Sequence, residues 1–125
     1  MSAISIKTSA VLVVEDDPLL LDDTTATLRD QGFEVLSAEN AAAALQTLET
    51  RADIGVMVTD VEMPGMNGLQ LSREVRDRWP PIEIIIVSGY TSPSPIEMPQ
   101  RSLFFSKPTN LREIGKAIRN FGAQL

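Results

Sequence analysis

Five short apolar segments alternate with longer segments of helical pattern along the chain, and this alternation narrows the choice of fold more than any other feature. The first segment, residues 10–14, is apolar on both faces, as expected of a strand buried between two layers of helices. Strands that alternate with helices predict an α/β fold with a parallel sheet covered on both faces. The predicted strands are residues 10–14, 34–38, 54–59, 82–87 and 103–106.

Helical signals occur between these strands and after the last of them. Asp17, Asn40 and Asn110 are suited to cap helices, because their side-chain oxygens can accept bonds from free backbone N–H groups. Glu113 follows Asn110 by three residues, which predicts a capping box. A further helix is predicted for residues 69–79, where two prolines stop it.

Residues 91–100 depart from the alternation. This segment contains Pro93, Pro95 and Pro99, each of which lacks a backbone donor and favours extended geometry in the residue before it. A helix between the last two strands, the fourth in chain order, is therefore predicted to be short or missing. At most one turn is expected, near residues 96–98.

Length, charge and composition exclude several classes of protein. A chain of 125 residues suits one domain, predicted for residues 1–125 with a core of about 10–121. Its net charge of -6 argues against direct binding to nucleic acid. No apolar run reaches the length of a membrane span and the first ten residues lack a secretory signal, so a cytoplasmic location is expected. The chain has no cysteine for disulfides and no histidine for a catalytic triad.

Polar side chains follow four of the five predicted strands. In open parallel sheets, ligands bind beyond the carboxyl ends of the strands, so these side chains are candidates for one site. They are Glu15, Asp16 and Asp17 after the first strand, Asp60 and Glu62 after the third, Ser88 after the fourth, and Lys107 after the fifth.

This set of groups suits phosphoryl transfer. Clustered carboxylates repel one another and recruit a cation, and hard oxygen ligands favour Mg²⁺. A carboxylate beside Mg²⁺ can attack phosphorus to form an aspartyl phosphate, while an ammonium group offsets the charge on the phosphoryl oxygens. Each residue alone would be read as a turn former, a helix cap or a loop serine. Their joint occurrence at four strand ends favours the site.

Four motifs together resemble the receiver domain of two-component response regulators, over about residues 10–121. They are VVEDDP at 13–18, TDVEMPGMNG at 59–68, IVSGY at 86–90 and FSKP at 105–108. The resemblance implies a flavodoxin-like three-layer sandwich whose five parallel strands lie in the order 2-1-3-4-5. It also implies a phosphorylation-dependent signalling switch. Such a domain is regulatory and not an enzyme, because it catalyses only its own phosphorylation and dephosphorylation.

The resemblance assigns roles to individual residues. Asp60 corresponds to the phospho-acceptor, Lys107 to the lysine that pairs with the acceptor and the phosphate, and Ser88 to the switch hydroxyl. Phe104 corresponds to the switch aromatic, although Phe104 and Phe105 could both be ordinary core residues.

A divalent metal site is also implied. Glu15, Asp16 and Asp60, with the backbone carbonyl of Glu62, correspond to the ligands of Mg²⁺ or Mn²⁺. Glu62 and Tyr90 occupy positions thought to influence how water reaches the acyl phosphate.

The expected phosphodonor is a histidine kinase or a histidine phosphotransfer protein, and a further protein would receive the output. No membrane partner is expected. Two other functions are alternatives: a pseudo-receiver that binds proteins without phosphorylation, and a phosphatase with the aspartate motif of haloacid-dehalogenase enzymes at 60–62. The latter enzymes place that motif after the first strand and need a longer chain. The start at Met1, with no output segment after Leu125, favours a stand-alone regulator over the receiver of a hybrid kinase, unless more chain lies downstream.

Overall fold

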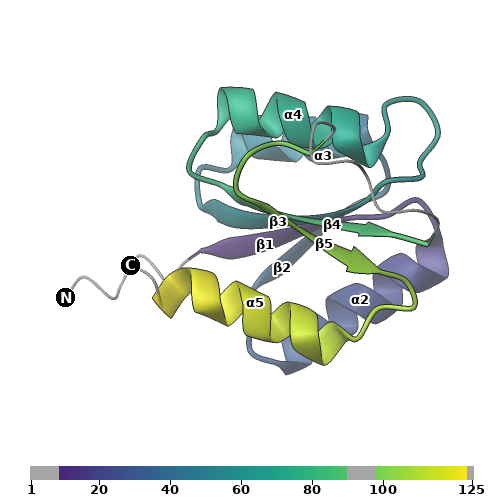
Figure 1. Cartoon of the computed structure of the whole chain (residues 1–125), viewed down its shortest axis with the longest axis vertical. Helices are drawn as coiled ribbons and strands as arrows, with labels where there is room; N and C mark the ends of the chain where they lie inside the picture. The colour runs from purple at the N-terminus through teal and green to yellow at the C-terminus, as the bar shows by residue number, and fades with distance from the viewer. Residues whose placement is uncertain (1–8, 90–97, 124–125) are drawn as a thin grey trace.

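A five-stranded parallel sheet forms the centre of the fold (Figure 1). The computed structural model describes residues 9–89 and 98–123. The strands lie in the spatial order β2-β1-β3-β4-β5, which confirms the predicted order. Their bounds are β1 Ala10–Val14, β2 Val35–Ala38, β3 Ile54–Asp60, β4 Glu83–Ser88 and β5 Ser102–Ser106.

Helices cover both faces of this sheet, so the three-layer α/β prediction is also confirmed. In Figure 1, α3 and α4 lie over one face while α2 and α5 lie over the other. The bounds of the helices are α2 Pro18–Asp30, α3 Ala41–Thr50, α4 Gly68–Arg78 and α5 Leu111–Ala123.

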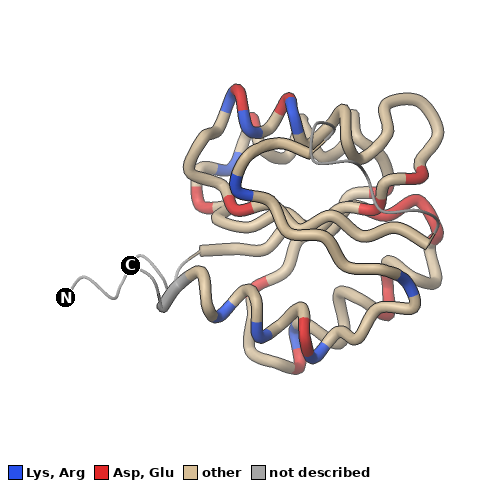
Figure 2. The backbone as a smooth tube through the Cα atoms, viewed as in Figure 1, with Lys and Arg blue, Asp and Glu red and all other residues tan. Residues whose placement is uncertain are grey.

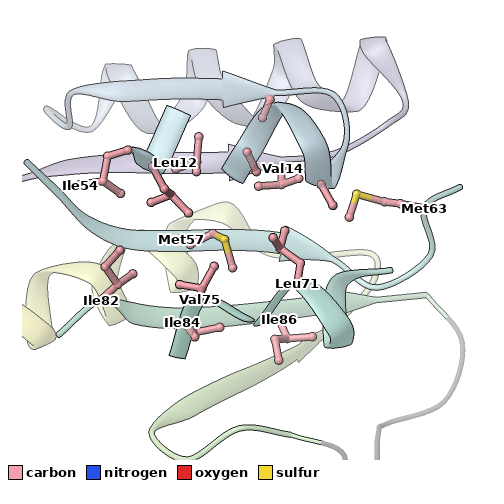
Figure 3. Packing of buried hydrophobic residues seen from close by; sticks show 14 of the residues in the cluster. Leu12, Val14, Ile54, Met57, Met63, Leu71, Val75, Ile82, Ile84 and Ile86 are labelled. Atoms are coloured by element: carbon pink, nitrogen blue, oxygen red, sulfur yellow. The ribbon is translucent and has the colours of Figure 1, made fainter. Parts of the chain in front are cut away.

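Two hydrophobic clusters hold the layers together, because successive residues of a strand point to opposite faces. Leu12, Met57 and Ile84 belong to the cluster under α3 and α4, where they pack with Leu71 and Val75 of α4 (Figure 3). The second cluster, under α2 and α5, contains their strand neighbours Val11, Val56 and Ile85. Burying each large apolar side chain contributes about 1.5–3 kcal/mol. Both faces of the sheet are thus buried in the hydrophobic core.

Side-chain caps begin three of the described helices, α2, α3 and α5, at the predicted positions. Asp17 accepts bonds from two backbone N–H groups of α2, and Asn40 accepts one from α3. Asn110 accepts bonds from the N–H groups of residues 112 and 113, which forms the first half of the predicted capping box. A reciprocal capping box occurs instead at Asn67 and Gln70, at the start of α4.

The far end of α4 is also fastened by side chains. Trp79 caps the helix, packs against the cluster under α3 and α4, and has the guanidinium of Arg78 4.4 Å from its ring centroid. Arg76 donates to four backbone carbonyls, at 2.7–3.0 Å: those of Pro80, Ile82, Gln100 and Arg101. The guanidinium of Arg76 therefore ties α4 to the turn that precedes β5.

The connection from β4 to β5 is described only at its two ends. Of the segment predicted to lack a regular helix, residues 91–97 lie outside the described residues, and residues 98–101 form a bend and a turn. Met98 packs against the cluster under α3 and α4. Within the described ranges there are four helices, and none of them lies between β4 and β5. None of these helices is long and apolar enough to cross a membrane.

Candidate functional site

The carboxyl ends of β1 and β3 lie side by side, because the parallel register pairs Val14 with Thr59. The next residue of the chain in each case is a buried acid: Glu15 directly follows β1, and Asp60 is the last residue of β3. One carboxylate oxygen from each of Glu15, Asp16 and Asp60 lies within 4.8 Å of the other two. Figure 2 shows acidic segments gathered at the end of the sheet to which the strands of Figure 1 point. Three predicted metal ligands are thus brought together.

Lys107 reaches the same carboxylates from the end of β5. Its Nζ lies 3.2 Å from Oδ2 of Asp60 and 3.3 Å from Oε1 of Glu15. The backbone N–H of Lys107 donates to the carbonyl of Ser88 at 2.8 Å, which continues the pairing of β4 with β5 past the last strand residue. The peptide bond from Lys107 to Pro108 is cis.

The charges in this cluster shift two pKa values. Burial raises the pKa of Asp60, the charge of Glu15 raises it further, and Lys107 lowers it; the result is a pKa of about 6. Burial by itself would lower the pKa of Lys107, but the carboxylates of Asp60 and Glu15 outweigh burial, so that pKa is raised. The ammonium group is therefore charged at neutral pH and is the counter-ion of Asp60.

One oxygen of Asp60 is left for another group. Oδ1 is buried and has no hydrogen-bond partner among the described residues, whereas Oδ2 pairs with Lys107. A buried polar atom without a partner costs roughly 1–3 kcal/mol, and such costs are typical of functional sites. Oδ1 is thus available to a cation or to a reacting atom.

Gly68 holds the loop after β3 close to the site. A Cβ at this position would lie 1.9 Å from the carbonyl oxygen of Asp60, so only glycine allows the approach. The N–H of Gly68 donates to the carbonyl of Val61 at 2.9 Å. This bond fastens the start of α4 to the residue directly after the predicted acceptor. The sequence indicated a loop here but not the contact.

Ser88 lies at the end of β4 and is only 1% exposed. Its Oγ donates to Oε2 of Glu62 at 2.6 Å, so a side chain that follows β3 contacts one that ends β4. The sequence predicted Ser88 as the switch hydroxyl and Glu62 as a metal ligand through its backbone carbonyl. Both roles stay predictions, and the bond between the two side chains was not predicted.

The two aromatic residues of β5 face opposite layers. Phe104 is half-buried against the cluster under α3 and α4, and Phe105 packs against the cluster under α2 and α5. The role of Phe104 as a switch aromatic remains a prediction. Tyr90, singled out for its position after Ser88, lies outside the described residues.

Two cavities adjoin the carboxylates. One of about 230 Å³ reaches Glu15, Asp60 and Lys107 from the side of α2. The other, of about 470 Å³, lies between Asp16, the start of α3 and residues 64–66. The site is therefore open to small molecules and to side chains of a partner.

Comparison with known proteins agrees with this arrangement. The family model described as "Response regulator receiver domain" matches residues 11–119. The chain belongs to this family of receiver domains, which are regulatory modules of two-component systems. Among solved structures, a receiver domain from Clostridium thermocellum has a TM-score of 0.86 at 25% identity, covering 93% of this chain and 95% of that one. One from Sinorhizobium medicae WSM419 has a TM-score of 0.85 at 26% identity, covering 93% and 95%.

Curated relatives include regulators and sensor kinases. The hydrogenase transcriptional regulatory protein HoxA of Cupriavidus necator is 41% identical over 85 residues, which cover 68% of this chain and 17% of that protein. The transcriptional regulatory protein GlrR of Escherichia coli is 30% identical over 90% of this chain and 26% of its own length. The sensor kinase CckA of Brucella abortus is 30% identical over 89% of this chain and 12% of its own length. The chain thus spans about a quarter or less of the length of these three relatives.

Proposed function

We propose that this receiver domain is a phosphorylation-dependent switch in which Asp60 accepts a phosphoryl group from a phosphohistidine. The phosphohistidine would belong to a histidine kinase or a histidine phosphotransfer protein. The main support is the environment of Asp60, a buried carboxylate paired with Lys107 at 3.2 Å and clustered with two further acids. Nothing in an ordinary core requires this combination of charges.

The transfer is a displacement at phosphorus. A carboxylate oxygen of Asp60 forms a bond to the phosphorus as the bond from phosphorus to the imidazole nitrogen breaks. The leaving nitrogen keeps the electron pair, and the imidazole of the partner then takes up a proton. Lys107 stays beside the acceptor throughout and offsets negative charge on the phosphoryl oxygens. Hydrolysis of the acyl phosphate would later return Asp60 and inorganic phosphate.

The residues present fit a divalent cation. Three carboxylates whose oxygens lie within 4.8 Å of one another, and a buried oxygen of Asp60 without a partner, form the kind of hard donor set that suits Mg²⁺ or Mn²⁺. Glu15, Asp16 and Asp60 would hold the ion, with the backbone carbonyl of Glu62 as a further ligand. When bound, the ion would supply positive charge for the phosphoryl oxygens.

After transfer, the signal would pass through the neighbouring strands. In this proposal Ser88 donates a hydrogen bond to a phosphoryl oxygen, and Phe104 changes its packing in response. The domain turns over no external substrate. Its output would be altered binding of a downstream protein.

The likeness to CckA, which is named a sensor kinase, and to HoxA and GlrR, which are named regulatory proteins, supports a place in a two-component relay. We propose the cytoplasm as the compartment. With a net charge of -6, this domain is not expected to bind nucleic acid itself.

Incubation with acetyl phosphate and Mg²⁺, followed by intact mass spectrometry, tests the proposal. The wild type should gain the mass of one phosphoryl group, and hydroxylamine should remove it, as expected of an acyl phosphate. Asp60→Asn should gain nothing. Asp22→Asn, on the exposed surface of α2, is the control and should be labelled like the wild type. Labelling of Asp60→Asn at unchanged yield would refute the assignment of the acceptor.

A phosphorylated histidine phosphotransfer protein is the second donor to test. Absence of label in the wild type with both donors would overturn the proposal. That result would favour the alternative, a pseudo-receiver that binds its partners without phosphorylation.

A further inference from the structure

The contact between Ser88 and Glu62 joins the last residue of β4 to the loop that follows β3. Ser88 is 1% exposed, and its Oγ lies 2.6 Å from Oε2 of Glu62, within the range of a hydroxyl bound to an ionised carboxylate. The two strands β3 and β4 are adjacent, since Asp60 pairs with Val87 and the N–H of Val61 donates to the carbonyl of Val87 at 3.0 Å. The carboxylate of Glu62 therefore reaches across the end of the sheet.

A serine hydroxyl carries one proton and can donate it to one acceptor at a time. In the phosphorylated state proposed above, Ser88 donates that proton to a phosphoryl oxygen. In the structure, it donates the proton to Glu62. The two bonds exclude each other, so the bond to Glu62 has to break before Ser88 can contact the phosphoryl group.

We propose that the side chain of Glu62 is a latch that holds Ser88 in the unphosphorylated state and competes with the phosphoryl group for its hydroxyl. This inference rests on the proposed function and adds a regulatory role for the Glu62 carboxylate, distinct from the backbone carbonyl assigned to the metal. The phosphoryl group can shift the protein to the switched state only by the free energy with which it favours that state over the latched one. Because the bond from Ser88 to Glu62 stabilises the latched state, it lowers the fraction of phosphorylated molecules that switch.

Like-charge repulsion would assist release of the latch. The charge of Glu62 already acts on Asp60, where it is one of the influences that raise the pKa of that acid. A phosphoryl group on Asp60 brings more negative charge to the same place, which disfavours a carboxylate held nearby. Glu62 would then turn outward as Ser88 turns toward the phosphoryl group.

Glu62→Asp separates the latch from simple electrostatics. The aspartate keeps the charge, but it is shorter by one carbon–carbon bond, about 1.5 Å. Its oxygen would then lie beyond hydrogen-bond distance of Ser88 Oγ. The backbone carbonyl at position 62 is unaltered. Glu62→Asp is made both in the wild type and in the Ser88→Ala background, and the four proteins form a double-mutant cycle.

The first readout is the dissociation constant of beryllofluoride, a phosphoryl mimic, in the presence of Mg²⁺. Glu62→Asp should tighten binding of the mimic about tenfold when Ser88 is present, because the competitor for its hydroxyl is gone. In the Ser88→Ala background the same substitution should change binding by less than about twofold. Equal effects in the two backgrounds would overturn the latch.

The second readout does not depend on phosphorylation. Urea unfolding in EDTA should show non-additive losses for Glu62→Asp and Ser88→Ala, because either substitution removes the same bond. If the losses of stability are additive and acetyl phosphate still labels the wild type, the latch is refuted and the proposed function is unaffected. If the losses of stability are non-additive but the wild type neither binds beryllofluoride nor is labelled, the proposed function is rejected. The competition that defines the latch is then rejected with it.

Discussion

Nζ of Lys107 lies 3.2 Å from Oδ2 of Asp60, so the cation that follows the last strand is the ion-pair partner of the acid that ends β3. This pairing opposes the influences that raise the pKa of Asp60, which are burial first, then the charge of Glu15 and that of Glu62. The balance leaves Asp60 with a pKa of about 6, above its ordinary value of 3.8. Keeping Asp60 ionised at neutral pH therefore lowers the free energy of unfolding.

Without metal, the stability of the wild type should fall relative to Asp60→Asn as the pH rises from about 4 to about 7. In this window the folded state retains on Asp60 a proton that the unfolded state has lost. Protonation thus favours the fold at low pH, and this contribution disappears as the pH passes the folded-state pKa of about 6. The change should be at most about 3 kcal/mol.

Urea unfolding in EDTA at a series of pH values measures this difference. Asp22→Asn, which changes the same chemical group on an exposed surface, should follow the wild type. Parallel curves for the wild type and Asp60→Asn would contradict the raised pKa.

Mg²⁺ affinity should distinguish two neighbouring aspartates. Asp16 contributes an oxygen to the carboxylate cluster, whereas the side chain of Asp17 caps α2 by accepting from Leu19 and Leu20. Asp16→Asn should weaken Mg²⁺ binding at least about tenfold, since it removes a charged ligand. Asp17→Asn removes the same charge but leaves a good cap and should weaken binding far less.

Isothermal titration calorimetry measures both affinities. In the absence of metal, Asp16→Asn should be no less stable than the wild type, because the substitution relieves repulsion among the acids. Equal losses of affinity in the two variants would mean that Mg²⁺ responds to overall charge and not to a built site.

Several features of the site follow from the sequence because they depend on strand position alone. Once apolar runs define five parallel strands, residues 15, 60, 88 and 107 must lie at the same end of the sheet. The contacts of Glu62 and Arg76 depend instead on how flexible side chains from separate elements meet, and no periodic pattern records this. The tight approach of Gly68 to Asp60 likewise depends on the path of the loop in three dimensions.

Gly68→Ala should destabilise the protein by more than about 2 kcal/mol and slow phosphorylation. The added Cβ would lie 1.9 Å from the carbonyl oxygen of Asp60, so either α4 or the backbone of the acceptor has to move. Gly89→Ala is the matched control, because its Cβ would meet Lys107 at an ordinary 3.7 Å. Thermal unfolding and acetyl phosphate labelling measure both effects; equal behaviour of the two variants would refute a special role for Gly68.

Arg76→Ala should destabilise the protein by roughly 2–3 kcal/mol, because four backbone carbonyls lose a charged donor. Arg73→Ala removes the same side chain from an exposed position of α4 and should change stability by less than about 0.5 kcal/mol. Hydrogen exchange should also quicken at residues 98–101 in Arg76→Ala alone. Unchanged exchange there would show that the turn before β5 does not depend on Arg76.

Trp79 is placed to report movement of α4 through its fluorescence, at a distance from the carboxylate cluster. It is the one tryptophan of the chain and lies at the end of α4 opposite to Gly68, about 16 Å along the helix axis. Its fluorescence should therefore be insensitive to direct quenching by ions at the carboxylates. Because the other end of α4 rests on the backbone of Asp60, a change in tryptophan emission on phosphorylation would record displacement of the whole helix.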